Sequence, residues 1–202
     1  MTQSLWRGFM TDDAKDSPAL SSGLDGLAQA ATRAKKGDRP PIHQWNPPFC
    51  GDIGLKIARD GAWFYQGSPI GRPAMARLFS SILRKDPEGY MLVTPVEKVS
   101  VEVEDAPFLA VELLVEAGNL RLRTTVDDWV SVDAAHPLRF EPGPSGGLKP
   151  YVLVRDALWA LVARPVFYDL AALGEEREGF FGVASGGAFF PMSRADELEG
   201  FA

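Results

Sequence analysis

The sequence contains one cysteine, Cys50, and only two histidines, His43 and His136. A single cysteine excludes a disulfide within the chain, and so few cysteines and histidines exclude a zinc finger. The sequence also lacks a run of about 18 apolar residues, which a membrane-spanning helix requires, and its N-terminus lacks the apolar segment of a secretory signal. We therefore expect a cytoplasmic protein without a bound metal and without membrane association.

Basic residues are in deficit, with 21 Lys and Arg against 27 Asp and Glu and a net charge of −6. Binding to nucleic acid depends on clustered Lys and Arg that neutralise phosphates and release counterions. The charge balance therefore argues against direct nucleic-acid binding. Of the 202 residues, 46% are hydrophobic and 24% are charged, which is ordinary for a globular protein with a core.

Apolar residues recur at helical spacing in two segments of the first half of the chain. One segment follows Ser22 and comprises Leu24, Leu27, Ala28 and Ala31, and the other comprises Met75, Leu78, Phe79, Ile82 and Leu83. Both spacings predict helices with one apolar face. Between them, the alternation of Ile53, Leu55 and Ile57 predicts a strand, and Asp60-Gly61 predicts the hairpin turn that follows it.

The middle of the chain has the strongest strand pattern. Alternating apolar residues predict half-buried antiparallel strands over residues 99–103 and 109–115. A turn at Gly118-Asn119 places Glu116 opposite Arg121 and Val115 opposite Leu122. Further on, a helix is expected to begin at Pro150, with an apolar stripe of Tyr151, Val154, Leu158, Leu161 and Val162.

One phrase occurs twice: a strand, a tight turn, a tryptophan strand, a proline with a hydrophobic neighbour, and a helix. The first copy contains Asp60-Gly61, Trp63 and Pro69-Ile70, and the second contains Asp127-Asp128, Trp129 and Pro137-Leu138. These turns place Trp63 opposite Ala58, off the apolar face, and Trp129 opposite Val126, on the apolar face. The phrase indicates two related halves, although any α+β protein can contain two hairpins followed by helices.

Several short phrases together resemble a bacterial family of unknown function, DUF1285, over roughly residues 25–192. They are Asn46-Pro47-Pro48, Cys50-Gly51-Asp52-Ile53, Gly67-Ser68-Pro69-Ile70 and the runs 90–98 and 182–187. The resemblance implies a duplicated α/β core and a C-terminal half similar to pleckstrin-homology-like barrels. It also implies a ligand site between the halves, a nucleotide-like ligand and a role in signal transduction.

The patterns and the resemblance together predict an α+β fold of two related halves, each an antiparallel sheet with a helix. The C-terminal half is expected to be a small, partly open, barrel-like sheet with a packing helix. We place an N-terminal arm at residues 1–20, the N-terminal half at 21–95, the C-terminal half at 96–192 and a tail at 193–202.

The expected ligand-binding residues combine a stiff aromatic segment with arginines. His43, Trp45 and Asn46 lie among prolines, Arg72 and Arg139 follow the two Pro-hydrophobic steps, and Lys98 and Arg164 are second-rank candidates. An aromatic ring can stack on a base, Asn can pair with a base edge, and Arg can hold a phosphate with two hydrogen bonds. Alternatively, Trp45 fills the core and the arginines pair with acidic residues of a sheet.

We therefore expect a non-enzymatic module that binds a nucleotide-like small molecule between its halves, without a cofactor and without catalytic residues. One alternative is a protein-interaction adapter that uses a sheet edge or the aromatic arm of residues 1–20 to hold a protein partner. The other is a hydrolase that uses Cys50 with His43, although a lone cysteine is more often a packing residue. The glycine-rich residues 143–149 lack the Gly-Lys-Ser/Thr ending of a phosphate-binding loop.

Overall fold

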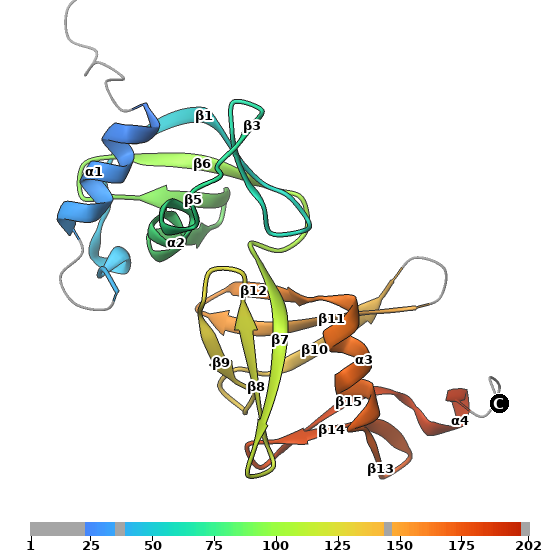
Figure 1. Ribbon diagram of the computed structural model, residues 1–202. Coiled ribbons are helices and arrows are strands. Elements are labelled where there is room, and N and C mark those ends of the chain that lie inside the picture. The colour runs from blue at the N-terminus through green and yellow to red at the C-terminus, as the bar shows by residue number, and fades with distance from the viewer. Residues whose placement is uncertain (1–22, 35–38, 144–146, 199–202) are drawn as a thin grey trace, which may run out of the picture.

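The computed structural model describes residues 23–34, 39–143 and 147–198, so the expected N-terminal arm lies outside the described residues. It contains two six-stranded mixed sheets and a smaller three-stranded sheet (Figure 1). The α+β class expected from the sequence is therefore confirmed. No helix within the described ranges is long and apolar enough to cross a membrane.

The first domain combines one six-stranded sheet with two helices that pack on each other (Figure 1). The strand order is β3-β2-β1-β6-β5-β4, and only the central pair, β1 and β6, is parallel. Leu27 of α1 and Phe79 of α2 are fully buried with Leu55 and Ile57 of β1. The elements are α1 (Leu24–Ala34), η1 (Ile42–Gln44), β1 (Phe49–Ile57), β2 (Trp63–Tyr65), β3 (Ser68–Pro69), α2 (Pro73–Ser81), β4 (Leu83–Asp86), β5 (Gly89–Val93) and β6 (Lys98–Val103).

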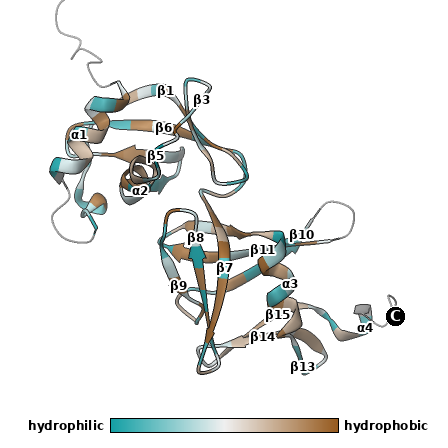
Figure 2. Ribbon diagram, viewed as in Figure 1, coloured by the Kyte–Doolittle hydropathy of each residue, from teal (hydrophilic) through white to brown (hydrophobic). Residues whose placement is uncertain are grey.

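The second domain contains a six-stranded sheet that curls into a half-barrel, followed by α3 and the three-stranded sheet β13-β14-β15. Its long strand β7 is mostly apolar and runs through the middle of the domain (Figure 2). The elements are β7 (Phe108–Glu116), β8 (Asn119–Thr124), β9 (Trp129–Ser131), β10 (Leu138–Pro142), β11 (Leu148–Arg155), β12 (Leu158–Val162), α3 (Arg164–Ala172), β13 (Glu175–Arg177), β14 (Phe180–Ser185), β15 (Ala188–Arg194) and α4 (Ala195–Leu198).

The two large sheets have the same topology. The second sheet has the order β9-β8-β7-β12-β11-β10, so strands numbered one to six along each unit give 3-2-1-6-5-4 in both sheets. In both, the first and sixth strands form the parallel central pair, β1 with β6 and β7 with β12. The expected pair of related halves is therefore present. The parallel pairs were not expected, because the alternation of a strand does not specify the direction of its neighbours.

The repeated phrase does not mark equivalent positions in the two units. The turn before Trp63 joins the first and second strands of its unit, whereas the turn before Trp129 joins the second and third. The counterpart of the first turn is Ala117-Gly118, between β7 and β8. The helices also differ, because α2 lies between the third and fourth strands, whereas α3 follows the sixth.

The faces expected for the two tryptophans are wrong. Trp63 pairs with Ile57 and is 3% exposed, because the amide of Ala58 bonds to the carbonyl of Ala62 and the loop spans residues 58–62. Trp129 pairs with Arg123 and is 40% exposed. In both hairpins the connection is longer than the two residues expected, and a change in loop length by one residue reverses the face.

The helix expected from Pro150 is also wrong, because residues 148–162 form the hairpin of β11 and β12. Asp156, with a φ of 47°, lies in the turn that separates the two strands. Each strand then buries alternate apolar residues, including Val152 and Val154 on β11 and Leu158, Ala160 and Val162 on β12. The helix of this unit begins at Arg164 instead, with Pro165 in its first turn.

The hairpin of β7 and β8 turns one residue earlier than expected. Ala117 and Gly118 form the turn, with φ angles of 49° and 77°, so Val115 lies opposite Leu120 and Glu116 opposite Asn119. The expected pairing of Val115 with Leu122 is therefore wrong. Arg121 still forms an ion pair with Glu116 at 3.0 Å, but along a diagonal of the ladder.

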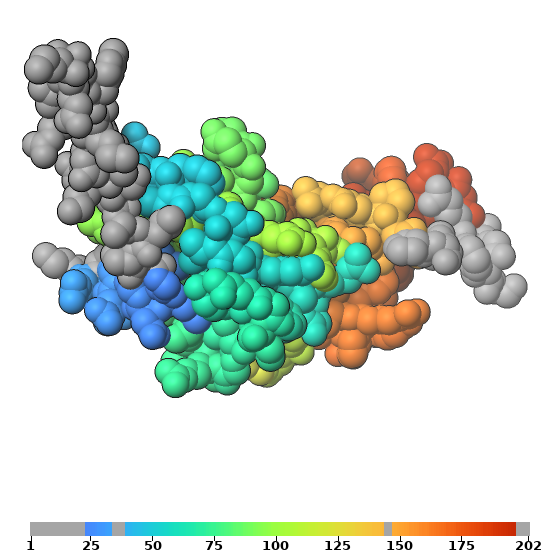
Figure 3. Space-filling view, turned by 90° about the horizontal axis from the view of Figure 1, so that it is seen from above, coloured from blue at the N-terminus to red at the C-terminus, as the bar shows by residue number. Residues whose placement is uncertain are grey.

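The domain boundary lies later than the expected position between residues 95 and 96. β6 pairs with β1 and β5 in the first sheet, so the first domain extends to Val103 and the link to β7 comprises residues 104–107. The molecule is elongated, with the first domain at one end and the second at the other (Figure 3). Arg155, whose side chain is 11% exposed, ties them together by donating to Asp128 of its own domain and to the carbonyl of Ser80, each at 2.6 Å.

Candidate functional site

Three hollows follow one another across the junction of the two domains. Glu104 lines both the first and the second hollow, and Arg59 and Lys149 line both the second and the third. We call them the sheet-face hollow, the junction pocket and the α3 groove. Because they share these side chains, a ligand in one hollow lies beside the next.

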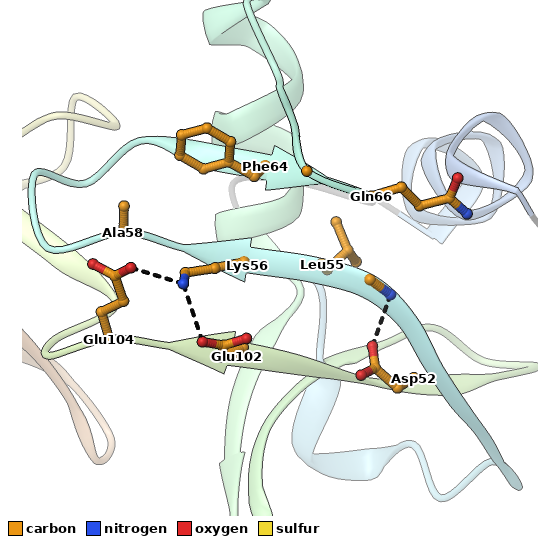
Figure 4. A pocket seen from close by; sticks show the side chains of 10 residues that line it. Asp52, Leu55, Lys56, Ala58, Phe64, Gln66, Glu102 and Glu104 are labelled. Atoms are coloured by element: carbon orange, nitrogen blue, oxygen red, sulfur yellow. Dashed lines mark hydrogen bonds and ion pairs between the residues drawn. The ribbon is translucent and has the colours of Figure 1, made fainter.

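The sheet-face hollow has a volume of about 430 Å³ and lies on β1, β2 and β6 (Figure 4). Lys56 bridges two carboxylates, with its Nζ 3.2 Å from Glu102 and 2.8 Å from Glu104. Hydrogen bonds to Glu104 and Glu102 raise the pKa of Lys56. Asp52 is the third carboxylate of the lining, and three carboxylates against one lysine make this hollow unfavourable for a phosphate.

The junction pocket has a volume of about 390 Å³, which lies within the range of small-molecule sites. The first domain contributes side chains from the β1–β2 turn and β5, and the second contributes side chains from β10, β11 and β12. The interdomain link supplies the remainder. The lining residues are Arg59, Tyr90, Glu104, Asp105, Ala106, Arg139, Glu141, Lys149, Tyr151 and Trp159.

Asp105 is the central acceptor of the junction pocket, and its side chain is only 6% exposed. It accepts hydrogen bonds from Lys149 Nζ at 2.6 Å and Tyr151 OH at 2.7 Å, and Arg59 Nε lies 3.5 Å away. Burial of Asp105 opposes its ionisation, but the bonds from Lys149 and Tyr151 outweigh burial and lower its pKa. The Asp105–Lys149 pair is therefore charged at neutral pH.

Arg139 forms the aromatic wall of the pocket together with two rings. Its guanidinium carbon lies 4.2 Å from the ring centroid of Trp159 and 5.2 Å from that of Tyr151. Glu141 Oε1 lies 3.0 Å from Arg139 Nη2. Arg139 is held opposite Tyr151 by the pairing of β10 with β11, so strand register places the cation on the rings.

Two tyrosines supply further hydroxyl groups. Burial raises the pKa of Tyr90, which the first domain contributes, and burial also raises the pKa of Tyr151. Both hydroxyls therefore stay protonated at neutral pH; Tyr151 donates its hydrogen bond to Asp105, and Tyr90 can donate to a ligand. The pocket thus offers three cations, three carboxylates and neutral donors around aromatic rings.

The structure distributes the expected ligand-binding residues over several places. Arg139 lines the junction pocket and Arg164 lines the α3 groove. Lys98 pairs with Asp86 at 3.0 Å, in the same cluster as Arg84. These three side chains therefore do not meet at one site.

The proline-rich segment likewise lies away from the three hollows. His43 pairs with Asp156 of the second domain at 3.2 Å, and Trp45 packs against the core. Asn46 is exposed, as is Arg72, the residue before α2, and neither lines one of the three hollows. Cys50 lies partly buried, with its Sγ 3.6 Å from the carbonyl of Pro48.

The sequence patterns missed most of the junction pocket. Arg59, Tyr90, Asp105, Lys149 and Trp159 come from separate elements, and only the sheet pairings and the turn at residues 58–62 bring them together. The signal that could have found Lys149 and Trp159 is strand alternation over residues 148–162. The helical interpretation of that segment concealed it.

Family models and solved structures match this chain. "Domain of unknown function (DUF1285), N-terminal domain" matches residues 40–106, and "Protein of unknown function (DUF1285), C-terminal domain" matches residues 107–192. A DUF1285 family protein from Silicibacter pomeroyi DSS-3 shares 48% identity, with a TM-score of 0.82 over 89% of this chain and 99% of that chain. A second, from Shewanella baltica OS155, shares 30% identity, with a TM-score of 0.49 over 58% of this chain and 89% of that chain. A search of the curated proteins finds no match.

Proposed function

The chain belongs to the DUF1285 family, and from this premise we propose that its junction pocket binds a nucleotide-like small molecule. In this proposal the protein is a non-enzymatic ligand-binding module of the cytoplasm with a role in signal transduction. The observation that carries the proposal is the stack of Arg139 on Trp159 and Tyr151, beside Lys149 and Arg59 and between two domains.

The aromatic wall suits a planar base. A base can stack on a guanidinium plane, and Arg139, which itself lies over Trp159, offers such a plane. Lys149 and Arg59 lie beside Asp105, and their remaining N–H groups can donate hydrogen bonds to a phosphate. The lining therefore offers partners for both the base and the phosphate of a nucleotide.

The charge balance favours a small ligand over a polyanion. The three cations of the lining face Glu104, Asp105 and Glu141. A polyphosphate would meet repulsion from these carboxylates, whereas the amino group of a base and the hydroxyls of a sugar can donate to them. A ligand with one phosphate and several neutral donors fits best.

The position of the pocket between domains supports the proposed signalling role. A ligand that contacts Tyr90 of the first domain and Arg139 of the second binds best when the two domains hold one relative position. Binding would then shift the population of domain arrangements by its difference in affinity for them. This is how a module without catalytic activity can report the concentration of a small molecule.

The test is isothermal titration of the full chain with nucleoside monophosphates, nucleoside diphosphates and cyclic mononucleotides, with Arg139→Ala as the site variant. We expect at least one nucleotide to bind and Arg139→Ala to weaken it about tenfold or more, because stacking and a charged hydrogen bond are both lost. Arg121→Ala is the matched control, since Arg121 also lies over a tryptophan, Trp129, and also pairs with a glutamate, Glu116. The proposal fails if no nucleotide binds or if both variants weaken binding equally.

A further inference from the structure

The α3 groove is the largest of the three hollows, with a volume of about 1000 Å³. Its lining residues come from β7, β11, β12, the start of α3 and the loops beside them. Most of its lining is apolar: Leu109, Leu148, Pro150, Leu161, Val162, Ala163 and Phe167. A lining of this kind binds ligands by removing their apolar surface from water.

All charged side chains that line the α3 groove are cationic. They are Arg59, Lys149 and Arg164, and no carboxylate lines it. Arg164 Nε donates to Tyr168 OH at 2.9 Å, and within the described part of the chain no carboxylate forms an ion pair with Arg164. The other two cations approach Asp105. Arg164 is therefore the cation of the groove that has its charge available for an anion.

We propose that the α3 groove binds a free long-chain carboxylate, with the acyl chain on the apolar lining and the carboxylate on Arg164. An apolar trough with one available cation at its rim is complementary to an amphiphile with one anionic head. The inference does not rest on the proposed nucleotide site, because Arg164 and the apolar residues do not line the junction pocket.

Strand pairing favours an acyl chain over a peptide. β7, β11 and β12 all lie inside their sheet, with a partner on both sides. An extended peptide in the groove would find no free strand edge to satisfy its backbone groups. An acyl chain has no such groups, so burial against the lining leaves no polar atom without a partner.

The charge of the chain favours a free amphiphile over a membrane surface. A peripheral site on an anionic bilayer typically uses a cluster of Lys and Arg. The groove has three cations on a chain with a net charge of −6, so the protein as a whole is repelled by such a surface. A single soluble anion meets only the local cations.

The test is titration of the full chain with octanoate, decanoate and dodecanoate below their micelle concentrations, and with the alcohols of equal length. Affinity should rise about fourfold for each added methylene that is buried. Each carboxylate should bind about fivefold more tightly than its alcohol, because only the carboxylate can form an ion pair with Arg164 as well as a hydrogen bond.

Two variants separate the head from the chain. Arg164→Gln should remove the preference for carboxylate over alcohol and keep the dependence on chain length. Ala163→Leu should fill part of the groove and weaken dodecanoate more than octanoate. Arg72→Gln is the matched control, since Arg72 and Arg164 are both exposed and both precede a proline at the start of a helix. Thermal unfolding of each variant reports whether it is folded.

Several results would overturn the inference. They are an absence of binding, an affinity that does not change with chain length, equal binding of carboxylate and alcohol, or an equal effect of Arg164→Gln and Arg72→Gln. Sedimentation with anionic phosphatidylglycerol vesicles without binding of monomeric carboxylate would assign the groove to a membrane surface instead. Nucleotide titration of Arg164→Gln should match the wild type, so this inference and the proposed function can fail separately.

Discussion

At the scale of single residues, Asp105 connects the junction pocket to stability. Its buried carboxylate accepts from Lys149 and Tyr151, so Asp105→Asn leaves Lys149 without its ionic partner. We expect Asp105→Asn to lower the free energy of unfolding at pH 7 by about 2 kcal/mol, because a partly buried charged pair loses one member. Urea unfolding measures the loss, and Asp169→Asn, at an exposed position of α3, is expected to change stability by less than about 0.5 kcal/mol.

The same variant gives a pH dependence with a defined sign. The pKa of Asp105 is lowered in the folded state, so its contribution to stability is fully present above the unfolded pKa of about 4. That contribution is lost as the pH falls through the folded pKa. The difference in stability between wild type and Asp105→Asn should therefore shrink below pH 4. An equal difference at pH 3 and pH 7 would contradict the assignment of the charged pair.

The limits of sequence reasoning at this scale are clear from the tryptophans. Their presence beside tight turns identified two hairpins, but their faces depend on loop length. In the first hairpin, the amide of Ala58 donates to the carbonyl of Ala62, the loop is longer than two residues, and Trp63 is buried. In the second hairpin, the loop that contains Asp127, with a φ of 62°, is also longer than two residues, and Trp129 is exposed. Asp105 carried no sequence signal, because its partners Lys149 and Tyr151 lie more than 40 residues away.

At the scale of elements, the turn between β7 and β8 tests the register of the second sheet. Gly118 has a φ of 77° and an added Cβ there would meet open space, so Gly118→Ala changes only the backbone. We expect a loss of about 1 kcal/mol, or a fall in Tm of about 2–4 °C. Gly71 also faces open space but has no left-handed φ, so Gly71→Ala should leave Tm unchanged or slightly raised. Equal Tm values for the two variants would refute this turn.

Elements with a clear period were predicted well, and those with two compatible periods were not. The strands near residues 99–103 and 109–115 and the helices near residues 24 and 75 are present. The apolar residues of 151–162 fit the spacing of a helix, and they also fit two short strands that a turn separates. The turn at Asp156, with its left-handed φ, decides between them, and this turn has no glycine or proline to reveal it.

At the scale of the whole molecule, one pocket is built from two domains of the same strand order. Both units have the strand order 3-2-1-6-5-4, and the β1–β2 turn of the first unit reaches the second, where an added Cβ on Gly61 would lie 3.2 Å from Leu109 Cβ. That approach brings Arg59 to Asp105. The repeat was visible in the sequence, but its correct alignment depends on strand order, which no single sequence period encodes.

The central claim is that a nucleotide-like molecule binds beside Trp159, and the indole N–H signals of the full chain test it most directly. The sequence has five tryptophans, and Trp159→Phe and Trp129→Phe identify the two relevant signals in ¹H–¹⁵N spectra. When the nucleotide that binds best saturates the protein, the Trp159 signal should shift while the Trp129 signal stays in place. A ligand that binds and leaves Trp159 unchanged, or that shifts Trp129 most, would contradict the claim.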